Sequence, residues 1–256
     1  MPFQKVEPEK LSHSVVRQIE GLILRGILRP GERLPSERDL AERLGVSRPS
    51  LREAVAELQE AGLLTTRAGA GIFVAEVLGS AFSPALIRLL ARHDEAVFDY
   101  LAFRRDLEAL AAERAARLAS DTDLKVIDTI FAKMEAAHLK RDPADEARLD
   151  AEFHMAIIEA SHNVVMLHMM RSMFDLLRQG VFYNRQVIFR QKTTRGTLLD
   201  QHRAIRDALF ARDPAAARAA VETHLAFVAR ALDEDRKSER NEAVARLRIA
   251  QEEGRG

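Results

Sequence analysis

The segment Arg29–Ala54 reads RPGERLPSERDLAERLGVSRPSLREA, and its helix-capping and helix-breaking residues predict two short helices joined by a tight turn. Ser36 and Ser47 stand where a side-chain oxygen caps the first turn of a helix, and Gly45 suits the left-handed residue that ends the first helix. Pro49 is tolerated near the start of the second helix, because the first turn donates no backbone hydrogen bond. Helix, tight turn and helix is the geometry that lays a second helix in the major groove of DNA.

Arginines occupy the positions that a DNA-binding helix uses. Arg48 and Arg52 lie four residues apart, so both project from one side of the second helix, near the end that meets base edges. Arg38 begins the preceding helix. The alternative is a set of solvated arginines on an ordinary surface helix, which the agreement of caps, turn and spacing disfavours.

Two strand-like runs follow the second helix. Leu63–Thr65 and Ile72–Val74 flank the segment Arg67–Gly71, whose glycines suit a tight hairpin close to a phosphate backbone. We interpret this hairpin, with Gly69 near its tip, as the wing of a winged helix-turn-helix.

Net charge does not reveal a DNA-binding domain here. Residues 1–76 carry 2 Lys and 9 Arg against 11 Asp and Glu. Attraction to phosphate must therefore come from a local patch and should weaken as salt increases. That patch comprises Arg38, Arg48, Arg52 and Arg67.

The 256-residue chain has the composition of an ordinary globular protein, with 47% hydrophobic and 30% charged residues. Cysteine is absent, which excludes disulfides, thiol catalysis and cysteine-ligated zinc. The sequence shows neither a signal peptide nor a run of about 20 apolar residues. We therefore expect a cytoplasmic protein with no membrane contact.

The predicted fold is mainly α: a winged helix-turn-helix followed by an all-α antiparallel helical bundle. We expect a DNA-binding domain at 1–76, a linker at 77–93, an all-helical domain at 94–236 and a charged tail at 237–256. The tail is either a solvated helical extension or disordered. Apolar residues at helical spacing predict six bundle helices, at Glu95–Ala119, Asp123–Lys140, Asp145–Ala160, Val164–Phe182, Thr197–Ala211 and Ala215–Arg236.

Four residues of the predicted bundle are candidate metal ligands. Asp150 and His154 lie four apart on one helix face, and His202 and His224 come from two later helices. If these helices converge, their nitrogen and oxygen atoms suit a divalent ion such as Zn, Ni, Mn or Fe. Spacing alone leaves open that the histidines are hydrogen-bonded or exposed.

Residues 11–74 resemble the winged helix-turn-helix of the GntR family. The resemblance implies operator DNA as a partner, with DNA contacts at Arg38, Arg48, Arg52 and around Gly69. The runs that carry it are Leu34–Arg38 (LPSER), Ser47–Ala54 (SRPSLREA) and Arg67–Val74 (RAGAGIFV).

The region from Leu86 to Leu232 resembles the all-helical effector-binding (FCD) domain of the FadR-type branch of that family. In this branch a D-x-x-x-H pair and two later histidines hold a metal, and the resemblance places those ligands at Asp150, His154, His202 and His224. A complete ligand set implies a small carboxylate effector that binds the metal.

Arg104 matches the arginine of the R-x-x-L-E run in the branch's first effector-domain helix. The resemblance implies that its planar guanidinium clamps the effector carboxylate. The alternative is an i,i+4 salt bridge between Arg104 and Glu108 on a solvent-facing surface.

Further runs, among them Glu159–Val165, resemble the regulators of lactate, glycolate and pyruvate metabolism in this branch. The hypothesis is a homodimeric repressor whose operator binding responds to a 2-hydroxy or 2-oxo acid at the metal. One alternative is a metal-dependent hydrolase, although no general base or nucleophile motif accompanies the ligands. The other is a DNA-binding dimer whose bundle has no ligand.

Overall fold

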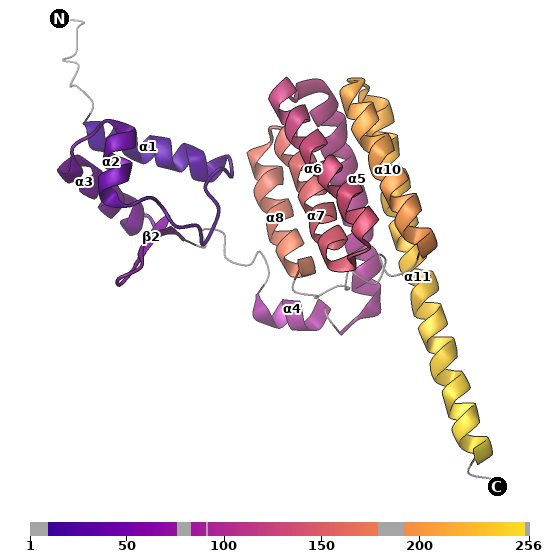
Figure 1. Cartoon of the computed structure of the whole chain (residues 1–256). Helices are drawn as coiled ribbons and strands as arrows, with labels where there is room; N and C mark the ends of the chain where they lie inside the picture. Colours follow the sequence, from indigo (N-terminus) through magenta and orange to yellow (C-terminus); the bar gives the residue numbers. More distant parts are fainter. Residues whose placement is uncertain (1–9, 76–82, 91, 179–191, 254–256) are drawn as a thin grey trace, which may run out of the picture. The chain divides into compact units, whose positions relative to one another are not determined.

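The computed structural model describes residues 10–75, 83–90, 92–178 and 192–253. The chain divides into two compact units, Met1–Ala81 and Phe82–Gly256 (Figure 1). Each unit buries its own hydrophobic residues. None of the described helices is long and apolar enough to cross a membrane.

The N-terminal unit has the predicted helix-turn-helix and wing. The side-chain oxygen of Ser36 accepts a hydrogen bond from the backbone of Asp39, and that of Ser47 accepts one from Ser50. Gly45 ends the first of these helices with a φ of 65°, which a residue with a side chain rarely adopts. The elements are α1 (Leu11–Leu24), α2 (Glu37–Leu44), α3 (Arg48–Glu60), β1 (Leu64–Arg67) and β2 (Gly71–Val74).

One apolar stripe of α3 forms the centre of this unit. Leu51, Ala54 and Leu58 are fully buried and belong to one cluster with Val15 and Ile19 of α1. Burial of such aliphatic side chains is worth about 1.5 to 3 kcal/mol each. It leaves the opposite, polar face of α3 in solvent.

The wing is an antiparallel pair in which Leu64 lies opposite Val74 and Arg67 lies opposite Gly71. The strands are longer at the turn than predicted, because Arg67 and Gly71 both pair. Gly71 has a φ of 106°, and a β-carbon there would lie 3.2 Å from the Arg33 side chain. Only glycine fits this position without strain.

The C-terminal unit is a bundle of helices, as predicted. Short connections with strong caps reverse the chain: Ser120 and Asp123 form a reciprocal capping box at α6, and Asp142 caps α7. Its elements are α4 (Pro84–Leu90), α5 (Asp94–Leu118), α6 (Asp121–Lys140), α7 (Pro143–Ala160), α8 (Val164–Arg178), α10 (Lys192–Phe210) and α11 (Pro214–Glu253). The last residues of the helix predicted at Val164–Phe182 lie outside the described residues.

Helix α4 lies within the predicted linker and was not expected. A serine followed by a proline also occurs in linkers, but here the Ser83 hydroxyl accepts a hydrogen bond from the backbone of Leu86 and so caps a new helix. Proline is well suited to the first position that follows such a cap. Ile87 and Leu90 then pack against the bundle core.

Helix α11 continues beyond the predicted end at Arg236 as far as Glu253. Its residues after Lys237 are mostly exposed, and Figure 1 shows this part (yellow) extending past the other helices of its unit. Of the two alternatives for the charged tail, the structure therefore has the solvated helical extension.

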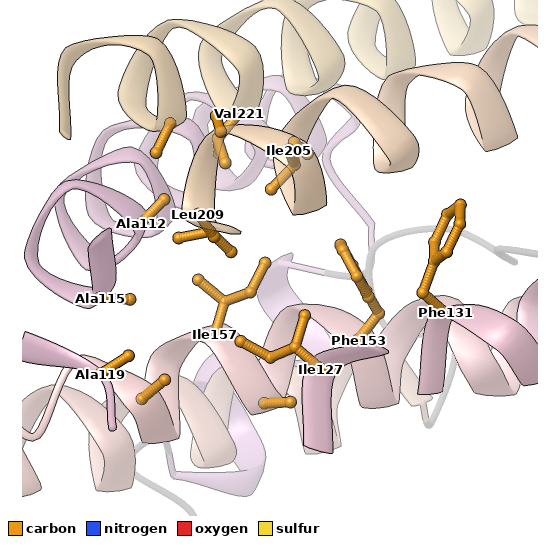
Figure 2. Packing of buried hydrophobic residues seen from close by; sticks show 14 of the residues in the cluster. Ala112, Ala115, Ala119, Ile127, Phe131, Phe153, Ile157, Ile205, Leu209 and Val221 are labelled. Carbon is orange, nitrogen blue, oxygen red and sulfur yellow. The ribbon is translucent and has the colours of Figure 1, made fainter. Parts of the chain in front are cut away.

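The core of the bundle combines alanines of α5 with larger side chains from the helices around it. Ala112 and Ala115 are fully buried, and Figure 2 shows that they face Leu209 of α10 and Ile157 of α7 across the interior. Small residues let helix backbones approach closely, so the larger neighbours fill the space at high density. This packing fixes the axes of the helices that carry the candidate metal ligands.

Phe153 connects this core to those ligands. Its ring is fully buried and lies 6.2 Å from the Phe131 ring and 5.2 Å, edge to face, from the His202 imidazole, centroid to centroid. We expect F153A to lower the free energy of unfolding of the metal-free protein by about 3 to 5 kcal/mol, because a large buried ring is removed.

Urea unfolding followed by circular dichroism measures this loss. L139A is the control, because Leu139 is 83% exposed on α6, and its effect should stay within about 0.5 kcal/mol. Equal stability of the two variants would contradict this account of the core.

Candidate metal centre and DNA-binding surface

The structure brings all four candidate metal ligands together. Asp150 and His154 lie one turn apart on α7, while His202 comes from α10 and His224 from α11. One ligand atom of each residue lies within 4.8 Å of those of the other three. The four residues are at least 95% buried, so they form an enclosed site rather than a solvated surface cluster.

The three rings turn their Nε2 atoms toward a common point. Nε2 of His154 lies 3.2 Å from Nε2 of His224 and 3.3 Å from Nε2 of His202. Oδ1 of Asp150 lies 3.1 Å from Nε2 of His202 and 3.7 Å from Nε2 of His154. The four residues thus present three nitrogen atoms and one oxygen atom to a single centre.

Oxygen atoms close to the outer nitrogen of two rings favour the tautomer that carries its proton on Nδ1. Nδ1 of His154 lies 2.7 Å from Oε2 of Glu108, and Nδ1 of His224 lies 3.1 Å from Oε1 of Gln201. These oxygens accept, so Nδ1 is the donor in both rings. Nε2 of a neutral ring then holds a lone pair that points at the shared centre.

Nitrogen atoms at this separation need a proton or a cation between them. A proton on one ring serves a single contact, whereas a divalent metal ion at the centre serves all three rings and the Asp150 carboxylate at once. Three imidazoles and one carboxylate are a donor set that zinc and similar transition metals accept. The residues present therefore fit such an ion.

Burial favours the neutral, metal-binding form of the imidazoles of His202 and His224. It lowers the pKa of His202, and it lowers the pKa of His224 well below the usual value, with further lowering from the neighbouring histidines and Arg104. Neutral imidazole is the form of histidine that coordinates metal ions. The charge of Arg104 is one of the causes of the lowered pKa of His224.

Arg104 forms a buried ion pair beside this centre. Its Nε lies 2.6 Å from Oε1 of Glu108, and both side chains are at most 3% exposed. The i,i+4 pairing considered in the sequence analysis therefore exists, but its expected solvent exposure is wrong. The guanidinium also lies 4.9 Å from the centroid of the Phe174 ring, which shields one side of it.

Glu108 carries a full negative charge in this interior. Burial alone would raise its pKa, but the charge of Arg104 and the contacts with Arg104 and His154 lower the pKa below the usual range of a glutamate. Sequence reasoning did not select Glu108 or Gln201 as site residues. Their spacing from Arg104 and His202 was visible, but their contacts depend on how α5, α7 and α11 pack.

A pocket in the bundle also reaches His202. Within it Arg195 holds Glu146 through its Nε, 3.0 Å from each carboxylate oxygen, and donates a hydrogen bond to the carbonyl of His138. This buried ion pair was not selected from the sequence either. The lining residues are Met134, His138, Glu146, Arg195, Leu199 and His202.

In the N-terminal unit the candidate DNA-binding arginines are exposed. Arg48 and Arg52 extend from the first turns of α3, with side chains 58% and 62% exposed, and Arg38 of α2 is 80% exposed. Glu37 accepts a hydrogen bond from Arg52 at 2.8 Å and lies 3.9 Å from Arg48. Sequence reasoning missed Glu37, whose carboxylate contacts both arginines on the exposed face and so restricts their orientation.

The wing contains one arginine that we expect to contact DNA, Arg67, and a glycine in its turn, Gly69. The guanidinium of Arg67 lies 4.4 Å from the centroid of the Phe73 ring, a cation–π contact that orients the side chain. Gly69 adopts a φ of 71° in the turn between the strands. Both residues are therefore placed where the wing can approach a phosphate backbone.

Comparison with known sequences agrees with both units. Residues 11–74 match the family described as bacterial regulatory proteins, gntR family, and residues 99–227 match the FCD domain. A structure described as Streptococcus agalactiae GntR aligns with a TM-score of 0.51 and 26% identity, covering 86% of this chain and 99% of that one.

Two curated relatives from Escherichia coli K12 span nearly the whole protein. One, described as a putative L-lactate dehydrogenase operon regulatory protein, is 39% identical and covers 87% of this chain and 86% of its own length. The other, the Glc operon transcriptional activator, is 34% identical and covers 88% and 89%. These relatives are transcription regulators, which argues against the hydrolase alternative. The chain belongs to the GntR family and is a DNA-binding transcription regulator with a C-terminal FCD domain.

Proposed function

We propose that this regulator responds to a small carboxylate that binds at a divalent metal held by Asp150, His154, His202 and His224. The observation that carries the proposal is the convergence of three imidazole nitrogens and one carboxylate oxygen within 4.8 Å in a buried site. The metal is zinc, or nickel, manganese or iron. When bound, it supplies a Lewis acid that two oxygens of a 2-hydroxy or 2-oxo acid can chelate.

Arg104 supplies the second recognition element. Its guanidinium lies close enough to the metal ligands to lower the pKa of His224, and a planar fork suits a carboxylate. Glu108 holds Nε of this guanidinium, so an effector would take its hydrogen bonds from the terminal nitrogens.

Charge balance favours an effector with one negative charge. Asp150, Glu108 and Arg104 together carry a net charge of minus one beside metal-bound, neutral histidines. A divalent cation makes the site plus one, and a monocarboxylate neutralises it. Neutral sites are the least costly to bury, so lactate, glycolate and pyruvate fit better than dicarboxylates.

The relatives support an acid of this kind. The 39% identical regulator is named for an L-lactate dehydrogenase operon. We infer that the present regulator acts as a homodimer in the cytoplasm, where the operator lies, and places two α3 helices on a palindromic site. Repression relieved by the effector needs a coupling of only about 1 to 3 kcal/mol, which changes operator affinity by about 5- to 150-fold.

The side chains of Arg48 and Arg52 would read base edges, with Arg38, Arg67 and the Gly69 turn on the backbone. We expect R52A to weaken binding by about 1 to 3 kcal/mol on a duplex that the wild-type protein selects from a random library, because a bidentate contact to guanine is lost. Fluorescence anisotropy at one fixed salt concentration measures the difference.

R25A is the matched control, because exposed Arg25 follows α1 outside the helix-turn-helix. It should retain the base preference of the wild-type protein. Unchanged affinity and base preference in R52A would show that Arg52 does not contact base edges in the major groove.

His202 tests the metal centre separately from DNA binding. We expect H202A to lose more metal affinity than the roughly 10- to 100-fold that follows loss of an outer-shell partner, because a direct ligand disappears. Competition with a chelator measures the affinity, and binding to the selected duplex without effector should largely remain.

H162A is the control, because His162 lies on the surface against Asp123 of α6. Its metal affinity should equal that of the wild-type protein. Equal metal affinity in H202A would contradict the assigned ligand set, while loss of DNA binding alone would contradict the division of labour between the two units.

A thermal-shift titration identifies the effector. We expect L-lactate, glycolate or pyruvate to raise the melting temperature of the metal-loaded protein more than succinate does, because a ligand that binds only the folded state stabilises it. The shift should vanish after chelation with EDTA and in R104M. If none of the acids shifts the metal-loaded protein, the effector assignment is wrong, whereas the role in DNA binding stands.

A further inference from the structure

Glu108 touches both parts of the proposed effector site. Its Oε1 lies 2.6 Å from Nε of Arg104, and its Oε2 lies 2.7 Å from Nδ1 of His154. The side chain is 3% exposed and projects from α5, while His154 belongs to α7. The Glu108 carboxylate therefore contacts both Arg104, which would bind the effector carboxylate, and His154, a proposed metal ligand on another helix.

Sharing its two oxygens in this way restricts both partners. Oε2 accepts only from a protonated Nδ1, so it selects the His154 tautomer whose Nε2 faces the ligand cluster. Oε1 engages Nε of Arg104, which sets the plane of the guanidinium. Charge-assisted hydrogen bonds of this length are about twice as strong as neutral ones.

The corresponding support for His224 is weaker. Oε1 of Gln201 lies 3.1 Å from Nδ1 of His224, and a neutral amide attracts an N–H less than a carboxylate does. Coordination by Nε2 makes the imidazole N–H a better donor, and an anionic acceptor responds more strongly to that change. His154 is therefore the ligand whose strength depends most on its partner.

We propose that Glu108 is a positioning residue that orients His154 for the metal and Arg104 for the effector carboxylate. The inference rests on the proposed metal-dependent function, but its first part concerns the metal-free protein. A metal bound at His154 would draw the charge of Glu108 toward the imidazole and leave the charge of Arg104 less neutralised. Glu108 would thereby link metal binding at His154 to the readiness of Arg104 to bind an anion.

The first test needs neither metal nor effector. Nitrogen-15 NMR of the imidazoles in the metal-free wild-type protein at neutral pH reports the tautomer of each ring, and the His154 signals are assigned by their loss in H154Q. We expect His154 to be the tautomer protonated at Nδ1. A tautomer protonated at Nε2 would overturn the inference, whatever any variant shows.

The second test measures metal affinity in E108Q by competition of Zn²⁺ or Co²⁺ with a chelator. We expect a loss of about 10- to 100-fold, as for other partners of metal-binding histidines, together with a mixed His154 tautomer. E113Q is the matched control: Glu113 also lies on α5 and also bridges two side chains, Arg117 and Arg218, neither of them a metal ligand.

The outcomes separate this inference from the proposed function. If the wild-type protein binds no metal, the proposed function fails, while the tautomer measurement still decides whether Glu108 orients His154. If the wild-type protein binds metal and E108Q binds it equally well, Glu108 is a structural ion-pair residue and the inference is wrong. A loss in E113Q as large as that in E108Q would overturn it too.

Discussion

The convergence of three buried imidazoles and one carboxylate on a single point is the constraint on which the candidate site of the C-terminal unit depends. The imidazoles come from α7, α10 and α11, and one shared cation would satisfy all three at once. The alanines of α5 and the ring of Phe153 hold the helices close enough for this convergence. The packing that stabilises the bundle thus also assembles the candidate ligands.

The N-terminal unit works by the opposite arrangement. The residues that α3 buries are all apolar, and its charged side chains lie in solvent, where Glu37 accepts a hydrogen bond from Arg52. Exposed charges cost little to keep and are free to exchange partners. A regulator needs both kinds of site, one that retains a ligand in a closed interior and one that samples DNA readily.

Local signals in the sequence were sufficient for much of this fold. The caps at Ser36 and Ser47 and the glycine at position 45 predicted the helix-turn-helix, because capping depends on neighbouring residues alone. Ser83–Pro84 shows the limit, since the same pair can interrupt a chain or start a helix, and tertiary packing of Ile87 and Leu90 decides. Spacing placed the four candidate ligands on suitable helices, whereas the contacts of Glu108 with His154 and of Gln201 with His224 could not be predicted, because each joins two different helices.

The four candidate ligands span a long stretch of the chain, from Asp150 on α7 to His224 in the first third of α11. An ion bound by all of them would close long loops of the polypeptide and reduce the entropy of the unfolded chain, as a disulfide does. This chain has no cysteine, so coordination is its available form of cross-link. The proposed ion would then both stabilise the bundle and bind the effector. Loss of the ion would therefore destabilise the bundle and also abolish effector binding.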